Sequence, residues 1–321
     1  MRDGRPRILS AVIALLLPSS LFAAPPVSAG DVLEKGFRVH STSCFEITQP
    51  QGLGYIVKHA ACSPGGSWGP YLYVSLADAF DLFGPGVVAR IDSRGRISSS
   101  GLGGRVPGHF DFSSAGGPWG DRLWLDTANV LGTAPSIMGG CSSDVTNCDF
   151  TCADPGYFVF DRSGAFDHAL YTRILQGTVQ TVRLTDPHNC TLIDPDVIPH
   201  PDYEFFSAAP AAPVAFGPGG AWGTSLYAMP GTIIQPDGSY VTFGFPFGYV
   251  TWAADSSSPA WAGDMFARLS GGNAGDVYRV KPDGTSTLFA TDLPGEMAFC
   301  NDGLWFVRNG ACTKITATGP K

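Results

Sequence analysis

The chain has 321 residues, among them 41 glycines and 26 prolines, and only 15% of its residues are charged. This composition is typical of an all-β protein with many turns. The formal net charge of −8 argues against nucleic acid or an anionic membrane surface as a partner.

The first 29 residues have the layout of a signal peptide. Three arginines fall within the first seven residues, an apolar run covers residues 8–17, and Val27-Ser28-Ala29 is a small-residue cleavage site. The apolar run is too short to span a membrane. We therefore expect no membrane span, a mature chain from about Gly30, and a secreted or periplasmic location. Cleavage leaves 17 basic and 27 acidic residues, a net charge of −10.

From residue 65 the chain repeats one phrase, Gly-Gly-x-Trp-Gly, followed by a leucine and an aromatic residue. Its copies are centred on Trp68, Trp119 and Trp222, with a looser copy at Trp261 and a remnant at 303–305. The tryptophans are separated by 51, 103 and 39 residues, and the longest gap is close to two units. A period of about 40 to 50 residues with several short strands per unit predicts a β-propeller, in which stacked units bury each other's faces.

Each unit also contains a hairpin with glycine at the turn. The turn glycines are Gly95, Gly164, Gly238 and Gly284, each flanked by alternating apolar and polar residues. A weaker hairpin near residues 182–189 falls inside the double-length gap. We predict a single all-β propeller domain over residues 30–321, with six blades favoured and five or seven as alternatives, and a monomer.

Residues 131–155 are rich in Gly, Ser, Asp and Cys, which predicts an insertion loop in the second unit. Oxygen-bearing side chains in this stretch could bind calcium, and the alternative is a solvated loop pinned by disulfides. These side chains are Asp144, Asn147, Asp149 and Asp154.

All eight cysteines lie after the cleavage site, and an even number in an exported chain predicts disulfides. Asn309-Gly310 is a turn dipeptide between Cys300 and Cys312, which predicts that these two cysteines are paired. Pairing of Cys44 with Cys62 would join the segment before the first unit to that unit. The order of the remaining four stays open: Cys141, Cys148, Cys152 and Cys190.

The innermost strand of each predicted blade offers candidate site residues. Three residues before the core residue that ends each of these strands stand His59, His109, Tyr249 and Glu296. Equivalent positions on inner strands converge on the axis, and two histidines with one carboxylate are a common ligand set for a divalent metal such as zinc. Calcium would require more oxygen ligands. We assign Tyr249 to substrate binding. The alternative is that these side chains only line a wet channel.

Two segments carry a resemblance to known families. Residues 276–284, Asp-Val-Tyr-Arg-Val-Lys-Pro-Asp-Gly, and residues 293–299, Leu-Pro-Gly-Glu-Met-Ala-Phe, resemble six-bladed propellers of the NHL and gluconolactonase-like (SMP-30) type. The resemblance implies the same fold over about residues 55–315. For gluconolactonase-like enzymes it also implies a divalent ion on the axis.

Three functions are compatible with these features. The first, which the sequence favours, is a non-enzymatic exported propeller that binds an extracellular protein or glycan through one face. The second is a metal-dependent hydrolase of lactones or esters with its site on the axis. The third, a quinone-dependent sugar oxidoreductase, would need paired basic residues for the cofactor carboxylates. Arg90, Arg105 and Arg173 share no repeat position, so this function ranks last.

Overall fold

The computed structural model describes residues 31–42, 55–78, 86–101, 106–128, 137–143, 148–153, 158–176, 178–184, 214–228, 231–254, 256–261, 263–269, 272–273, 275–308 and 311–318. These ranges form β-strands and short 3₁₀ turns, and none of them contains an α-helix. The all-β prediction is therefore confirmed. In the same ranges no helix is long and apolar enough to cross a membrane.

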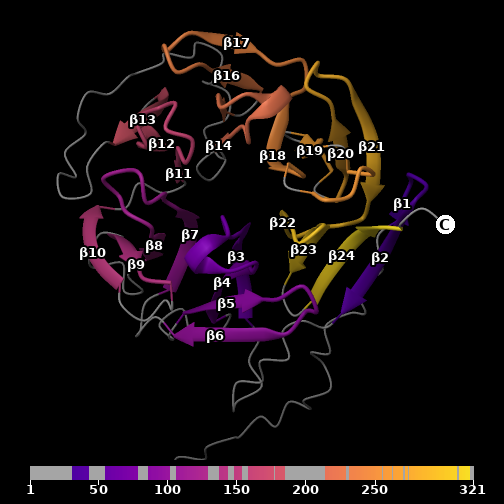
Figure 1. Ribbon diagram of the computed structural model, residues 1–321, viewed down its shortest axis with the longest axis horizontal. Coiled ribbons are helices and arrows are strands. Elements are labelled where there is room, and N and C mark those ends of the chain that lie inside the picture. Colours follow the sequence, from indigo (N-terminus) through magenta and orange to yellow (C-terminus); the bar gives the residue numbers. More distant parts are fainter. Residues whose placement is uncertain are drawn as a thin grey trace, which may run out of the picture.

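The described strands form six antiparallel sheets that stand around a central axis as the blades of a propeller (Figure 1). Each blade is a meander that runs from the axis outward. The first blade consists of β3 (Tyr55–Cys62), β4 (Leu72–Asp78), β5 (Val87–Ile91) and β6 (Ile97–Gly101). The second consists of β7 (Val106–Phe112), β8 (Leu123–Ala128), β9 (Ile137–Cys141) and β10 (Cys148–Ala153). The third consists of β11 (Phe158–Phe160), β12 (Leu170–Gln176) and β13 (Thr178–Leu184).

The remaining three blades follow the same plan. The fourth consists of β14 (Val214–Phe216), β15 (Leu226–Ala228), β16 (Thr232–Ile234) and β17 (Tyr240–Thr242). The fifth consists of β18 (Phe247–Trp252), β19 (Met265–Leu269), β20 (Val277–Val280) and β21 (Ser286–Thr291). The sixth consists of β22 (Glu296–Cys300), β23 (Gly303–Arg308) and β24 (Ala311–Ala317).

Two N-terminal strands complete the last two blades at the rim of the ring (Figure 1). β1 (Asp31–Val32) pairs with β21, and β2 (Phe37–Thr42) pairs with β24 over the register from Phe37 opposite Ala317 to Thr42 opposite Cys312. The sixth blade is thus built from both ends of the described chain. The N-terminal segment therefore closes the ring.

The tryptophans of the repeated phrase hold neighbouring blades together. Each is at most 6% exposed and packs against an aromatic ring of the following blade. Their positions are therefore equivalent, as the repeat predicts. The contacts are Trp68–Phe112, Trp119–Phe160, Trp222–Trp252 and Trp261–Phe299.

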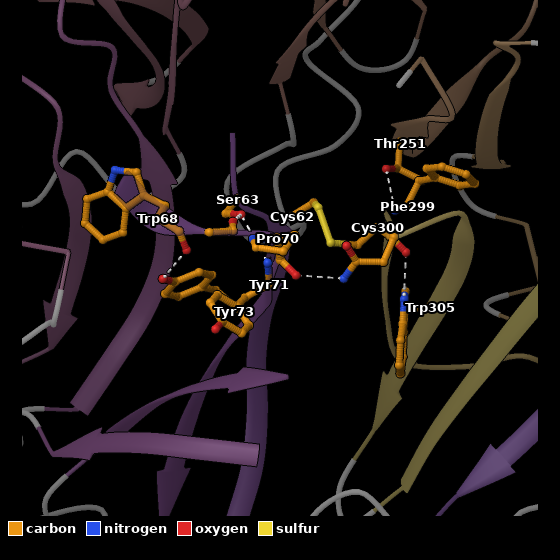
Figure 2. Close-up of a disulfide and its surroundings, with 12 residues drawn as sticks. Cys62, Ser63, Trp68, Pro70, Tyr71, Tyr73, Thr251, Phe299, Cys300 and Trp305 are labelled. Atoms are coloured by element: carbon orange, nitrogen blue, oxygen red, sulfur yellow. Dashed lines mark hydrogen bonds between the residues drawn. A yellow bond between two sulfur atoms is a disulfide. The ribbon is translucent and has the colours of Figure 1, made fainter. Parts of the chain in front are cut away.

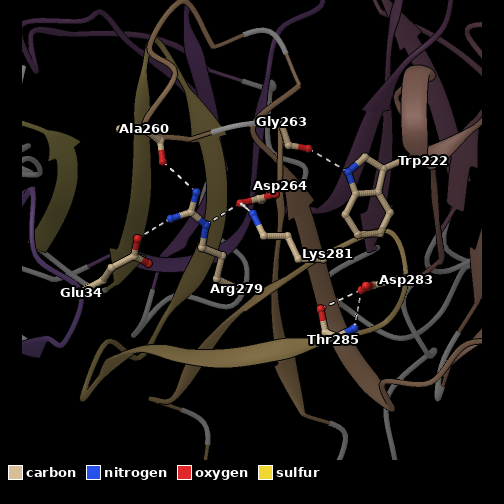
Figure 3. Close-up of polar contacts among 9 residues, drawn as sticks. All are labelled: Glu34, Trp222, Ala260, Gly263, Asp264, Arg279, Lys281, Asp283 and Thr285. Carbon is tan, nitrogen blue, oxygen red and sulfur yellow. Dashed lines mark hydrogen bonds and ion pairs between the residues drawn. The ribbon is translucent and has the colours of Figure 1, made fainter.

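Hydrogen bonds fix two of these indoles across the blade boundary. Trp68 donates from Nε1 to Asp121 at 2.7 Å, and Trp222 donates to the Gly263 carbonyl at 2.8 Å (Figure 3). In the first and third copies of the phrase glycine is required before the tryptophan because the turn there has positive φ, for example 93° at Gly219 and 57° at Gly220. Side chains with a Cβ rarely adopt such angles.

The hairpin glycines also behave as predicted. Gly95, Gly164, Gly238 and Gly284 have φ between 79° and 83°. One segment differs from the prediction, because residues 131–155 supply β9 and β10, the outer strands of the second blade, rather than a loop alone. Residue 140 on β9 is a glycine because any larger residue would place its Cβ 2.9 Å from the ring of Trp124. Asp144, Asn147 and Asp154 lie outside the described residues.

An ionic network centred on the buried carboxylate of Asp264 attaches the N-terminal segment to the fifth blade (Figure 3). The guanidinium of Arg279 on β20 donates to Glu34, to Asp264 and to the Ala260 carbonyl. Lys281 also donates to Asp264, whose carboxylate is almost fully buried. Because a buried carboxylate is stable only when it is paired, this network holds Glu34 and the strands beside it in one place.

The described disulfide differs from both predicted pairings. Cys62 is bonded to Cys300, with Cα atoms 5.2 Å apart (Figure 2). Pairing of Cys300 with Cys312 is therefore wrong, because β23 lies between their strands and strands are about 4.8 Å apart, too far for a disulfide to reach over two spacings. Pairing of Cys44 with Cys62 is wrong for the same bond, and Cys44 lies outside the described residues. Cys141 and Cys312 each take part in a disulfide as well.

We expect peptide mapping without reduction to recover a peptide containing Cys62 linked to a peptide containing Cys300. The bond joins two inner strands whose ends approach within bonding distance. Recovery of Cys300 linked to Cys312, or alkylation of Cys300 before reduction, would contradict this assignment.

Replacement of an inter-blade tryptophan should destabilise the whole ring. Trp68→Ala removes a ring that is 2% exposed, and we expect the free energy of unfolding to fall by about 3–5 kcal/mol in urea denaturation. Tyr240→Ala is the control, because Tyr240 is 50% exposed, and its effect should stay within about 0.5 kcal/mol. Similar losses for both variants would show that the tryptophan does not hold the blades together.

Candidate functional site on the propeller axis

Three predicted site residues lie together on the inner strands of neighbouring blades. His59 is on β3, His109 is on β7, and Glu296 begins β22. The Nδ1 atom of His59 lies 3.4 Å from Oε2 of Glu296, and the imidazole centroids of His59 and His109 are 4.1 Å apart. His59 is therefore contacted from both neighbouring blades, by Glu296 of the sixth and His109 of the second, and stands at the centre of this group. We call His59, His109 and Glu296 the axial cluster.

Irregularities in the strands place the two histidines. The register of β3 against β4 shifts between Val57 and His59, and that of β7 against β8 shifts between Pro107 and Phe110. A bulge changes the direction of the side chain beside it and often lies next to a functional site. β18 has the same kind of shift just before Tyr249. The three positions that the sequence repeat aligns therefore each lie at or beside a register shift in their inner strand.

Glu296 is placed by the turn before its strand. Gly295 has φ of 110°, and a Cβ at this residue would lie 2.4 Å from the Val307 carbonyl oxygen, so only glycine fits. The buried guanidinium of Arg268 on β19 donates to the carbonyls of Gly295 and Leu293. Burial lowers the pKa of Arg268, while Tyr249 and Glu296 oppose this shift. The start of β22 is therefore held by a charged side chain from the preceding blade.

The protonation of His109 is set by its surroundings. Its Nε2 lies 2.6 Å from the Phe158 carbonyl oxygen, and because a carbonyl only accepts, Nε2 carries the proton. Burial lowers the pKa of His109 well below the usual 6.5, and the proximity of His59 lowers it further, against the opposing effect of the Phe158 hydrogen bond. His109 is therefore a neutral imidazole at pH 7. His59 is 6% exposed, and the side chain of Glu296 is 29% exposed, so Glu296 is the more accessible member of the pair.

A second carboxyl group, Asp111, lies near His59 and was not predicted from the sequence. Asp111 is two residues after His109 on β7 and is 9% exposed. Burial raises its pKa, and the backbone amide of Phe160, which donates to it at 2.8 Å, opposes that rise along with the charges of Arg162 and His59. Its signal in the sequence is a single acid placed between two core aromatic residues, Phe110 and Phe112.

Tyr249 occupies a different environment from the axial cluster. It lies on β18 opposite Arg268, and its ring packs against the core around Trp261 and Phe299. Substrate binding by Tyr249 stays a prediction.

The geometry of the axial cluster does not fit the predicted metal set. Within the described ranges no group of three or more His, Cys, Asp or Glu side chains is arranged to hold a metal ion. The physical reason is visible in the contacts: Nδ1 of His59 faces Glu296, Nε2 of His109 faces a carbonyl, and the two rings pack against each other with their planes tilted by 53°. A shared ion would instead need lone pairs that converge on one point. We therefore derive no chemistry through zinc or calcium.

Comparisons with known proteins assign no family to the chain. No protein-family model matches it, and no curated protein matches it either. Among solved structures, a streptogramin B lyase aligns with 14% sequence identity and a TM-score of 0.48, covering 88% of this chain and 98% of the lyase. A glucose dehydrogenase aligns with 14% identity and a TM-score of 0.47, covering 84% of this chain and 98% of the other. At these values the likenesses assign neither a family nor an activity, and the NHL or gluconolactonase-like type stays a prediction.

The neutral state of His109 should make the fold sensitive to acid. Unfolded His109 takes up a proton below about pH 6.5, whereas the folded chain resists it, so the contribution of His109 to stability falls as the pH drops below 6.5. We expect the free energy of unfolding to fall less steeply with acid in His109→Gln than in the parent chain, measured by urea denaturation at steps between pH 7.5 and 5.

The comparison between variant and parent isolates His109 from other titrating groups. Asp111 has a raised pKa, so the folded state holds its proton more tightly and its contribution has the opposite sign. This contribution is common to both chains and cancels in the difference. Parallel curves for the two chains would show that His109 does not titrate between the folded and unfolded states.

Proposed function

We propose that this chain is a hydrolase that cleaves a small ester or lactone at the axial cluster, with His59 as the general base and Glu296 as the group that orients it. The observation that carries the proposal is the 3.4 Å approach of Glu296 Oε2 to His59 Nδ1 beside a neutral second imidazole. A carboxylate on one ring nitrogen fixes the tautomer and leaves the other nitrogen to accept a proton.

The reaction needs only water and the substrate. Nε2 of His59 accepts a proton from water while the oxygen of that water forms a bond to the carbonyl carbon. Glu296 stabilises the imidazolium that results. The tetrahedral intermediate then collapses, the bond from carbon to the alkoxide oxygen breaks, and the imidazolium returns its proton to that oxygen. General acid–base catalysis of this kind contributes about 10²- to 10⁴-fold to a rate.

His109 supports this chemistry without exchanging protons itself. Its ring packs on His59 at 4.1 Å between centroids, and its pKa lies far below neutrality. His109 therefore shields one face of His59 from water and does not compete for the proton. Phe110, whose ring centroid is 4.9 Å from that of His59, adds an apolar neighbour that strengthens the interaction between His59 and Glu296.

Export of the protein is part of the proposal. A disulfide such as Cys62–Cys300 persists in oxidising compartments and is rare in the cytosol. This supports the predicted secreted or periplasmic location, in which the substrate would be an extracellular small molecule. The predicted signal peptide, residues 1–29, lies outside the described residues.

A second function, binding of a protein or glycan through the surface of the disc, is supported by one surface feature. β17 is the outermost described strand of the fourth blade, and all three of its residues are exposed. Tyr240 and Val241 are 50% and 52% exposed, which is unusual for large apolar side chains. Exposed apolar side chains of this kind are suited to contact with another protein.

The test of the hydrolase uses purified mature protein with p-nitrophenyl acetate and γ-butyrolactone. We expect His59→Gln to lower kcat/KM by about 10²- to 10⁴-fold and Glu296→Gln by about tenfold or more, because the first removes the base and the second only its orienting partner. His40→Gln is the matched control, since His40 is an exposed histidine on β2 at the rim. It should retain the parent rate.

Two outcomes would contradict the hydrolase. One is hydrolysis by His59→Gln at the parent rate, and the other is the absence of any hydrolysis above buffer by the parent chain. In either case the surface of β17 becomes the favoured site. Addition of a chelator to the parent chain completes the test, because loss of hydrolysis would show that the reaction requires a metal ion and would contradict the metal-free mechanism.

A further inference from the structure

Two side-chain links join the inner strand of the first blade to the inner strand of the last blade. One is the approach of His59 to Glu296, and the other is the disulfide between Cys62 and Cys300. Cys62 is three residues after His59 on β3, and Cys300 is four residues after Glu296 on β22. At about 3.3 Å per residue the two links lie about 10–13 Å apart along the same pair of strands.

β3 and β22 belong to different sheets, so no backbone ladder fixes one against the other. The chain closes this boundary at the rim, where β2 pairs with β24. At the axis, the disulfide is the covalent connection between the two strands (Figure 2). Their relative position along the axis, which sets the distance from His59 to Glu296, therefore depends on the disulfide.

The C-terminal end of β22 is also held by hydrogen bonds from neighbouring strands. The amide of Phe299 donates to Thr251 of the fifth blade, and the indole of Trp305 donates to the Cys300 carbonyl (Figure 2). Arg268 holds the other end of the strand through Gly295. With β22 fixed at both ends, the bond to Cys62 transmits that fixed position to β3 and so to His59.

We propose that the Cys62–Cys300 disulfide is a positioning element for catalysis, which keeps His59 within reach of Glu296, so that loss of the bond disables the axial cluster while the propeller stays folded. This inference rests on the proposed function. A dithiol would break the bond by exchange: the disulfide of the protein becomes two thiols, and the dithiol becomes a cyclic disulfide. Cys62 is the more exposed of the two cysteines and is the end at which such exchange begins.

The central test is a double-mutant cycle on hydrolysis of p-nitrophenyl acetate. We expect the Cys62→Ala/Cys300→Ala variant to lower kcat about tenfold, because small displacements of a catalytic group cost large factors in rate. In the Glu296→Gln background the same pair of substitutions should cause little further loss, since both changes act on the same contact. Losses that multiply in the combined variant would overturn the proposal.

A stability control separates positioning from general weakening. Phe37→Ala removes an aromatic side chain of β2 whose ring packs on Trp261 and Phe289 in the same closing region. It should lower the melting temperature and leave kcat unchanged. If Phe37→Ala lowers kcat as much as loss of the disulfide does, the disulfide acts only through stability and the proposal fails.

A second measurement does not depend on any activity. Diethyl pyrocarbonate modifies accessible imidazoles, and mass mapping gives the rate for each histidine. In the parent chain buried His59 should react slowly relative to exposed His40. Loss of the disulfide should raise the ratio of the His59 rate to the His40 rate at least threefold at a temperature where both chains are folded, and reoxidation after dithiothreitol treatment of the parent should restore it.

The two measurements distinguish failure of the inference from failure of the proposed function. A faster reaction of His59 without detectable hydrolysis supports the positioning of His59 and rejects the hydrolase. Hydrolysis that requires His59 but is unchanged by loss of the disulfide, with no change in the His59 ratio, rejects the inference and leaves the hydrolase standing.

Discussion

Closure of the ring is the constraint on which the rest of the structure depends. A blade of three or four strands cannot bury both of its faces, so each face must be covered by the next blade, and the last must meet the first. In this protein that final contact is made twice, at the rim by β2 on β24 and at the axis by Cys62–Cys300 (Figure 1). The distance between side chains on opposite sides of this boundary, such as His59 and Glu296, depends on these two connections.

The axial cluster shows why such a boundary is suited to chemistry. Inner strands from different blades bring His59, His109 and Glu296 together although they are far apart in the sequence. Each strand is held by backbone hydrogen bonds within its own sheet. Its polar side chain at the axis is therefore available to contact side chains of the neighbouring blades. Burial then separates their roles, since it keeps His109 neutral while the accessible carboxylate of Glu296 faces His59.

Features that depend on local chemistry could be predicted from the sequence. The positive φ of Gly95 and Gly284 follows from the turns that they form, and the burial of Trp68 follows from the repeated phrase. The grouping of His59 with Glu296 could be predicted because residues at equivalent positions of a repeat lie at the same height along the propeller axis.

Features that depend on contacts between blades could not be predicted in the same way. The Asn-Gly turn between Cys300 and Cys312 predicts that they are paired, yet β23 separates their strands and the true partner of Cys300, Cys62, is 238 residues away. Nothing in the spacing marks Arg268 as the residue that grips the turn before Glu296. The wrong pairing and the missed arginine have one cause: the sequence records order along the chain, whereas the decisive neighbours lie in the adjoining sheet.

The pairing of β2 with β24 has a consequence for how the chain acquires its structure. His40 and Thr316 are hydrogen-bonded across a separation of 276 residues, so the outer strand of the sixth blade cannot pair until residues 311–317 have been made. Long-range pairing of this kind is slow, because the entropy of closing a large loop must be overcome before any contact rewards it. The preceding blades can form in order as the chain emerges, but the histidine and the glutamate of the axial cluster meet only at the last step. An incomplete chain would therefore be folded over most of its length and still lack its site.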